Sequence, residues 1–384
     1  MRQKLETLVA SSMMLFVTLT SYAEDSAEGV SFTPAIDVAR YNDSNVYTTS
    51  TGETASSITT IAPSIALDSA NGLGLKYAGE YSKYSHSSND NYQDHNLSLQ
   101  ANLKPSRKIN FKFRGNYVRG HDAVGSTASG SVTPDKWNQS GLGAQVNFGV
   151  EGARGNLLFE VVKDSKRYTT NPVQTAALEK DDLFTAAALS FRIWPKSSLF
   201  FRAEQTGINY GTRNADNMLS RYFAGIKWDA SGKTSGSIKI GSATKNFSDD
   251  SVHQDHSGSN WSATVRWVPV ERSRITLTTD RGFYDTTGGS DDVIDRKHQS
   301  IKWDYAWSSR VKSDINYKYG SDGYSGLSGT NRSDRISSYS MNVNYQMGRY
   351  WTVGMGYSNE RRDSNINSYD YTKKISMIHV NASL

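Results

Sequence analysis

Apolar and polar side chains alternate along most of this chain. In the stretch WDYAW, for example, Trp303, Tyr305 and Trp307 alternate with Asp304 and Ala306. A repeat of two residues places successive side chains on opposite faces of a β-strand, so that each strand has one apolar face and one polar face. Strands of this kind can build a soluble sandwich, with the apolar faces turned inward, or a membrane barrel, with the apolar faces turned toward lipid. The alternation therefore reduces the possible folds to these two all-β classes.

The connections between the strands favour the barrel. The pattern predicts about eighteen strands, with sixteen as the alternative, joined alternately by short turns and by long polar loops such as 84–94, 120–135 and 248–260. An even number of strands with short turns at one end and long loops at the other is typical of an outer-membrane barrel, and a soluble sandwich gives no reason for such regularity. We therefore expect residues 24–384 to form one transmembrane antiparallel β-barrel, with short periplasmic turns and long extracellular loops. The eight short turns are expected at 68–71, 104–107, 151–155, 194–196, 229–233, 268–273, 308–310 and 347–349.

The N-terminus indicates that the chain is exported. Arg2 and Lys4 precede an apolar run at residues 8–19, and the small residues of a cleavage site follow in the segment SYA. This pattern predicts a cleaved signal peptide over residues 1–23. The alternative, a membrane anchor, is disfavoured because about 20 apolar residues are needed to cross a bilayer and this run is shorter. A barrel with such a leader is expected to reach the outer membrane of a Gram-negative cell through the periplasm.

The composition excludes several kinds of chemistry. There is no cysteine, so disulfides, thiolate zinc sites and thiol nucleophiles are excluded. Only 36% of the residues are hydrophobic, too few for an ordinary globule of this length, and the net charge of +5 is too small to indicate a nucleic-acid partner. His253 and His256 form an H-x-x-H pair without a helix to align them, and the Asp-rich segment 288–295 lacks the spacing of a calcium loop. We therefore expect no metal and no cofactor, and we expect the polar loops to be solvated.

Aromatic side chains gather near the ends of the expected strands. Trp228, Trp267, Trp307 and Trp351 each lie within a few residues of an expected short turn and on the apolar face. Indole rings favour a membrane interface, with the ring in lipid and the N–H among headgroups, so these residues are expected to form an interface girdle. The alternative is that bulky aromatic residues simply favour strands, which explains their abundance but not their position.

The last expected strand reaches the end of the sequence. Ile378, Val380, Ala382 and Leu384 share one face of it. An incomplete strand would leave backbone groups unpaired in lipid, so barrel closure requires the final strand to be whole. Apolar residues at alternate positions of a terminal strand also resemble the signal that the barrel assembly machinery recognises. That signal usually ends in Phe, from which Leu384 departs, and we expect the four residues to serve as the assembly signal.

If the apolar faces point outward, the alternate side chains line the lumen. Barrels of 16–18 strands enclose an aqueous channel, in which charged side chains are tolerated. Basic groups outnumber acidic groups on these faces, which favours a conduit for a hydrophilic, anionic solute. The alternative is that every water-filled barrel needs a polar lumen and that the charges merely pair across strands. The expected pore-lining residues are Lys76, Glu80, Lys112, Arg114, Arg192, Arg202, Glu204, Arg221, Lys227, Lys239, Arg266, Lys302, Asp304, Lys312, Asp314 and Lys318.

Several stretches also give the chain a family resemblance. They lie at 39–67, 79–103, 261–281, 303–319 and 343–384, and include GEYSKYSHSSNDNYQDHNLSLQANL and WSATVRWVPVERSRITLTTDR. In these stretches the sequence resembles the β-barrel porins that are encoded with exopolysaccharide and capsule synthesis machinery, including the exosortase-associated barrels. The resemblance as a whole runs from about residue 30 to the end of the sequence, so it covers nearly all of the chain beyond the expected signal peptide.

This resemblance implies an outer-membrane porin that forms the exit channel for a secreted exopolysaccharide or capsular polysaccharide. It also implies that the barrel docks on a periplasmic polysaccharide export protein, and it brings no catalytic motif, so we expect no enzymatic activity. The first alternative is a general diffusion or solute-uptake porin. A less favoured alternative is an outer-membrane hydrolase that uses His379 or His256. His379, however, lies on the face of its strand that is expected to line the lumen, where a lipid substrate would not reach it.

Overall fold

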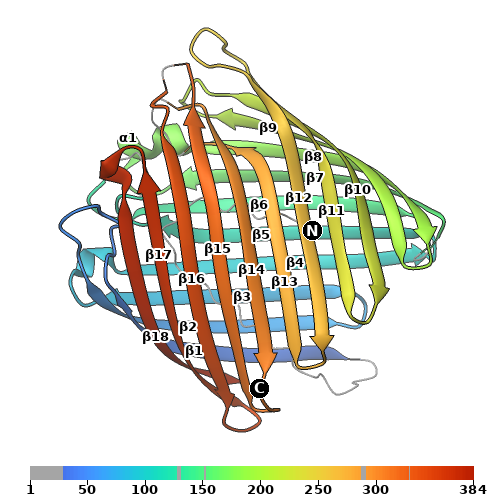
Figure 1. Ribbon diagram of the computed structural model, residues 1–384, viewed down its shortest axis with the longest axis horizontal. Helices are drawn as coiled ribbons and strands as arrows, with labels where there is room; N and C mark the ends of the chain where they lie inside the picture. Colours follow the sequence, from blue (N-terminus) through green and yellow to red (C-terminus); the bar gives the residue numbers. More distant parts are fainter. Residues whose placement is uncertain (1–28, 128–130, 151–152, 287–290, 328) are drawn as a thin grey trace.

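The fold is a closed β-barrel. The computed structural model describes residues 29–127, 131–150, 153–286, 291–327 and 329–384. Within these ranges the chain forms eighteen antiparallel strands in one sheet, which closes on itself (Figure 1). The predicted all-β barrel of eighteen strands is therefore confirmed. The predicted signal peptide, residues 1–23, lies outside the described residues.

The strands are longer than a membrane crossing requires. Each has 12 to 15 residues, whereas about 9–11 residues of a tilted strand cross a bilayer. In chain order they are β1 (Val30–Asp43), β2 (Ser56–Ser69), β3 (Leu73–Tyr84), β4 (Tyr92–Ser106), β5 (Ile109–Asp122), β6 (Asp135–Phe148), β7 (Gly155–Tyr168), β8 (Lys180–Trp194), β9 (Ser197–Tyr210), β10 (Asn217–Ser231), β11 (Thr234–Phe247), β12 (His256–Val270), β13 (Ser273–Tyr284), β14 (Val293–Ala306), β15 (Val311–Ser325), β16 (Ser333–Gln346), β17 (Trp351–Ser364) and β18 (Tyr371–Ser383).

The first and last strands close the barrel. Each strand pairs with its neighbours in sequence, and β1 also pairs with β18. In this pairing Val38 lies opposite Val380 and Ile36 lies opposite Ala382, so apolar side chains face the same side on both strands. Because side chains alternate with a period of two, a shift of one residue would turn the apolar face of one strand to the other side of the wall. The register therefore continues one apolar surface around the whole barrel.

The two ends of the barrel differ in the length of their connections. One end, the short-turn end, carries connections of two to six residues, and the other, the long-loop end, carries connections of six to twelve residues. β1 begins and β18 ends at the short-turn end. Strand pairing continues beyond the expected strand ends. The last five residues of the segment 248–260, which the sequence pattern predicts to be a loop, therefore belong to β12. Backbone pairing needs no apolar side chain, which is why the polar residues there remain in the sheet.

The long loops contain short helical turns that the alternating pattern does not predict. They are α1 (Pro172–Thr175) and the 3-10 turns η1 (Ser88–Asp90), η2 (Ala176–Leu178) and η3 (Asn367–Tyr369). No helix in the described part of the chain is both long enough and apolar enough to cross a membrane.

The two faces of the sheet differ in the way that the alternation predicts. Large apolar side chains are exposed on one face, among them Tyr222, Ile240 and Met355, which are 62%, 64% and 64% exposed. On the other face, side chains from strands that are not neighbours meet, as where Arg114 of β5 contacts Glu160 of β7 at 2.7 Å. Neighbouring strands lie about 4.8 Å apart, so side chains two strands apart converge most readily on the concave face. The polar face is therefore the inside of the barrel.

A small apolar core lies inside the barrel near the long-loop end. It consists of Leu219 of β10, Ala243 of β11, Phe283 of β13 and Val293 of β14, all of them buried. Val293 follows directly on the connection between β13 and β14 and is 0% exposed. The inside of the barrel is therefore packed along this part of its wall.

Candidate functional site

The inner wall near the short-turn end is basic. Seven of the basic residues expected to line the pore lie on the inner face here, each within four residues of the short-turn end of its strand, and all seven are exposed. Of these seven, only Lys302 forms an ion pair in the described part of the chain, with Asp304 at 2.9 Å. The other six form no ion pair with any described carboxylate. This basic vestibule consists of Lys76, Lys112, Arg192, Lys227, Arg266, Lys302 and Lys312.

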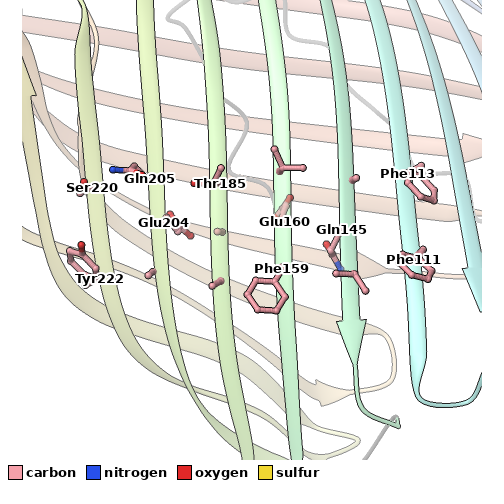
Figure 2. A pocket seen from close by; sticks show the side chains of 16 residues that line it. Phe111, Phe113, Gln145, Phe159, Glu160, Thr185, Glu204, Gln205, Ser220 and Tyr222 are labelled. Atoms are coloured by element: carbon pink, nitrogen blue, oxygen red, sulfur yellow. The ribbon is translucent and has the colours of Figure 1, made fainter. Parts of the chain in front are cut away.

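A row of ion pairs crosses the middle of the inner wall from β5 to β11. This charge ladder consists of Arg114, Glu160, Arg202, Glu204, Arg221 and Lys239. Its first half is built on Glu160, whose carboxylate lies 2.7 Å from a guanidinium nitrogen of Arg114 and 3.1 Å from one of Arg202. Arg202 links the two halves, because its Nε donates to Glu204 at 2.7 Å. Both glutamates can be followed in Figure 2.

The second half of the charge ladder shares one carboxylate among three cations. Besides Arg202, Glu204 faces the Nε of Arg221 at 3.0 Å and the ammonium group of Lys239 at 3.5 Å. The Glu204 side chain is 8% exposed, whereas those of Arg221 and Lys239 are 19% and 20% exposed. The Nε atoms of Arg114 and Arg221 are buried and have no hydrogen-bond partner among the described residues. Four cations thus share two carboxylates, which leaves two positive charges without a counter-charge in the charge ladder.

The wall from β15 through β18 to β1, on the far side of the barrel, carries more hydrogen-bonded polar groups. Asp314 of β15 accepts a hydrogen bond from Nδ2 of Asn342 at 3.0 Å. His379 of β18 is 5% exposed and lies 3.0 Å from the carboxylate of Asp37. Lys318 of β15 is exposed, and it has no ion pair with any described carboxylate. Ion pairs on this wall, such as that of Lys373 with Asp43 at 2.8 Å, lie toward the long-loop end. At the level of the charge ladder, the far wall therefore presents hydrogen-bonded groups such as Asp314 and Asn342.

Buried ion pairs join strands and loops at the long-loop end. Asp285, in the connection between β13 and β14, lies 2.5 Å from Lys245 of β11 and 3.3 Å from Lys180 of β8. Asp285 therefore contacts two strands that are not neighbours of β13 or β14. Burial alone would raise the pKa of the Asp285 carboxyl, but the ammonium groups of Lys245 and Lys180 bring this pKa well below its usual range.

Asp292, in the same connection, joins three loops. Its carboxylate lies 2.5 Å from Nδ1 of His253 and accepts hydrogen bonds from the backbone N–H groups of Gln254 and Leu327. Burial opposes ionisation of Asp292, but these hydrogen bonds outweigh it and lower the pKa of the carboxyl. The expectation that the Asp-rich segment 288–295 is solvated is wrong for its described part, since the Asp292 side chain is 3% exposed. The buried carboxylate is tolerated because donors from two other loops satisfy it.

Sequence reasoning missed this network of buried charges. A further example is the buried Asp322 of β15, which lies 3.2 Å from Arg296, and the half-buried Glu80 of β3 likewise accepts a hydrogen bond from the hydroxyl of Tyr92. The partners belong to different strands or loops, so the pattern within one strand does not reveal them. The one feature of the sequence that could have indicated this network is the clustering of acidic residues on the polar faces of the strands near the long-loop end.

The tryptophans expected in the interface girdle lie on the outer wall toward the short-turn end. Trp267, Trp307 and Trp351 are 47%, 58% and 53% exposed, and Trp228 lies on the same face near the end of β10. The four residues expected as the assembly signal lie at the end of the chain. Ile378, Val380 and Ala382 share the outer face of β18, and Leu384 follows the strand. The roles of both groups stay predictions.

A groove of about 600 Å³ lies on the wall formed by β5 to β10 (Figure 2). Aromatic side chains such as Phe113 and Tyr222 line it together with small residues such as Ala203. These residues belong to the apolar outer face, and Glu160 and Glu204 also border the groove because the wall is a single sheet thick. The groove therefore faces the surroundings of the barrel rather than a path through its lumen.

The histidines considered for metal binding or catalysis take part in other contacts. His253 is held by Asp292 and by the carbonyl oxygen of Asn214, and His379 is held by Asp37. His256 lies with its ring 6.3 Å from that of Phe283. In the part of the chain that the structure describes, no group of three or more histidine or acidic side chains is placed to hold a metal ion.

Comparisons with known proteins agree with the geometry. A family model described as "Putative beta-barrel porin 2" matches residues 31–384. No curated protein matches the chain. The barrel is similar to the outer membrane protein OpdK from Pseudomonas aeruginosa, with a TM-score of 0.50 and 10% identity over 92% of this chain and 99% of that one.

Two other solved barrels from Pseudomonas aeruginosa give similar values. OccK2 (OpdF) matches with a TM-score of 0.53 and 9% identity, covering 92% of this chain and 97% of that one. OccK3 (OpdO) matches with a TM-score of 0.51 and 12% identity, covering 92% of this chain and 95% of that one. At these identities the likeness concerns the fold alone.

Proposed function

This chain belongs to the beta-barrel porin 2 family and is an outer-membrane porin, and on this basis we propose that it is the exit channel for a secreted exopolysaccharide or capsular polysaccharide. The polymer carries acidic sugars, enters at the short-turn end from the periplasm and leaves at the long-loop end. The observation that carries this proposal is the basic vestibule at the short-turn end. No enzymatic step is needed for this function.

The basic vestibule would collect anions on the periplasmic side. Six of its seven side chains are without an ion pair to a described carboxylate, so positive charge is in excess at this end of the lumen. Charges of one sign around the mouth of a channel raise the local concentration of ions of the opposite sign. At the long-loop end, by contrast, charges such as Asp285 and Lys245 are paired and buried. This asymmetry favours a solute that is collected in the periplasm over one that is collected outside the cell.

The proposal assigns roles to the other features of the chain. Residues 1–23 are the signal peptide, the four tryptophans of the girdle lie at the periplasmic face of the membrane, and the last strand is read by the barrel assembly machinery. A periplasmic polysaccharide export protein docks at the short-turn end and delivers the polymer to the basic vestibule. The basic vestibule and the charge ladder line the water-filled lumen, together with Glu80, Asp304, Asp314 and Lys318.

The test is deletion of the gene followed by measurement of the uronic acid on the cell surface. Cells without the protein should lose surface polysaccharide, and the wild-type gene should restore it. A gene with Lys76, Lys112 and Arg192 changed to Gln should restore it only partly, because half of the unpaired charges of the basic vestibule are gone. Normal surface polysaccharide in the deletion strain would contradict the proposal.

A matched control removes the same charge from the outer wall. Arg119, Lys163 and Arg361 are exposed on the outer face, and their change to Gln should leave secretion intact. If both triple variants restored secretion fully, the basic vestibule would not be the basis of transport. Conductance in planar bilayers adds a second readout, since a constitutively open pore that passes neutral sugars freely would favour a general diffusion porin.

A further inference from the structure

The charge ladder has an excess of positive charge that its own residues do not neutralise. Its four cationic side chains are 19–31% exposed and share the carboxylates of Glu160 and Glu204. Charges that are partly withdrawn from water are costly when they lack a counter-charge. The buried Nε atoms of Arg114 and Arg221 also have no hydrogen-bond partner among the described residues. The charge ladder therefore has unused capacity for an anion.

The geometry around Glu204 indicates which anion would fit. Arg202, Arg221 and Lys239 already surround one carboxylate, at 2.7, 3.0 and 3.5 Å. A guanidinium group also binds carboxylates well, because two of its N–H donors match the two oxygens. Arg221 and Lys239 are held more loosely than Arg202, since the contact of Arg221 is not a hydrogen bond and that of Lys239 is long. The ammonium group of Lys239 also lies over the Phe223 ring, 4.0 Å from its centre. A turn of Arg221 and Lys239 toward a second carboxylate in the lumen would still break fewer close contacts to Glu204 than a turn of Arg202 would.

We propose that Arg221 and Lys239 form a binding site for the carboxylate of an acidic sugar, halfway along the lumen. This inference rests on the proposed function, because the acidic sugars of the exported polymer are the ligands that would occupy the site. Glu204 competes with each sugar carboxylate for the same two cations. Such competition keeps the site weak, and a conduit needs binding that is favourable enough for entry and weak enough for release.

The test is a titration of the full-length barrel in detergent micelles with sodium glucuronate, followed by saturation-transfer NMR. Arg221→Gln should weaken glucuronate binding roughly tenfold, the usual effect of losing a hydrogen bond to a charged group. Glu204→Gln should tighten binding several-fold, because it removes the competing carboxylate. Loss of folded protein cannot explain two effects of opposite sign. Glucose serves as the neutral probe, and its weak signal should not change between the variants.

Lys318→Gln is the comparator, since it removes one positive charge from the inner face of β15, away from the charge ladder. Its effect on glucuronate binding should be much smaller than that of Arg221→Gln. Equal weakening by the two variants would overturn the site, because it would indicate a field that fills the whole lumen. Weaker binding by Glu204→Gln would also overturn it, because Glu204 would then support the site rather than compete for it.

The failure of this inference can be told apart from the failure of the proposed function. Normal surface polysaccharide in the deletion strain would contradict export, and it would leave the glucuronate titration unaffected. Secretion that depends on the protein, combined with no glucuronate binding at Arg221, would contradict only the carboxylate site.

Discussion

An arginine in place of Ile315 should destabilise the barrel strongly, because it would put a charge on the outer wall. Ile315 lies on the outer face of β15 and is 39% exposed. Its partners on the neighbouring strands are Trp303 and Met341, which are 38% and 48% exposed, so the position lies within the apolar band. An arginine in the middle of such a band costs about 2–4 kcal/mol. Loss of the isoleucine adds about 0.5 kcal/mol.

The matched control is the neighbouring residue on the inner face. Asp314 accepts a hydrogen bond from Asn342 at 3.0 Å, and the side-chain oxygen of an asparagine could accept the same bond. Asp314→Asn should therefore cost less than about 1 kcal/mol. Urea unfolding of the refolded barrel in phospholipid vesicles, followed by tryptophan fluorescence, measures both free energies.

The comparison is decided by the difference between the two variants. A gap of about 2–4 kcal/mol is expected, which corresponds to roughly 30- to 1,000-fold in the unfolding equilibrium. Equal stability of the two variants would refute the assignment of faces on β15. A larger loss for Asp314→Asn would mean that the polar face, not the apolar one, meets lipid.

Three further predictions concern other parts of the barrel. Asp285→Asn should cost about 3–5 kcal/mol in urea unfolding, because Lys245 would stay buried without its partner. The pKa of Asp285 is lower in the folded barrel than its unfolded value of about 3.9, so its contribution is complete above roughly pH 5 and is lost as the pH falls toward the folded pKa. A fall in pH should therefore lower the free energy of unfolding of the wild type more than that of Asp285→Asn. If the unfolding free energies of the two proteins had the same pH dependence, this would argue against the ion pair. Trp307→Ala should lower the free energy of unfolding in vesicles by about 1–3 kcal/mol, measured by urea unfolding followed by circular dichroism. An unchanged free energy of unfolding would mean that Trp307 does not contact the membrane. Ile378→Asp should reduce the amount of the heat-modifiable, folded form in cell envelopes. An unchanged amount would mean that the apolar face of the last strand is not the signal that the assembly machinery recognises.

The architecture could be predicted from the sequence because a barrel wall is only one sheet thick. The side of the wall that a residue faces depends on its parity within its own strand, as with Ile315 outside and Asp314 inside. No knowledge of distant packing is needed for this assignment. The lengths of the connections then give the order of the strands, because each strand pairs with its neighbours in sequence.

The partners of the inner charges could not be predicted in the same way. The contact of Arg114 with Glu160 depends on the register of two successive strand pairs and on the curvature of the wall. The burial of Asp292 depends on three loops that fold toward one another. Sequence parity places such residues on the inner face, but it does not tell which charges are neutralised and which stay free for a solute.

The pairing of β1 with β18 makes the integrity of the barrel an all-or-none property. Asp37 and His379 interact across this seam although they lie 342 residues apart in the chain. Contacts of such long range form late and slowly in folding, since most of the chain has to be in place before they can close. Until then each end strand keeps a row of backbone donors and acceptors that lipid cannot satisfy. Loss of either end strand would therefore leave a sheet with two open edges rather than a slightly smaller pore.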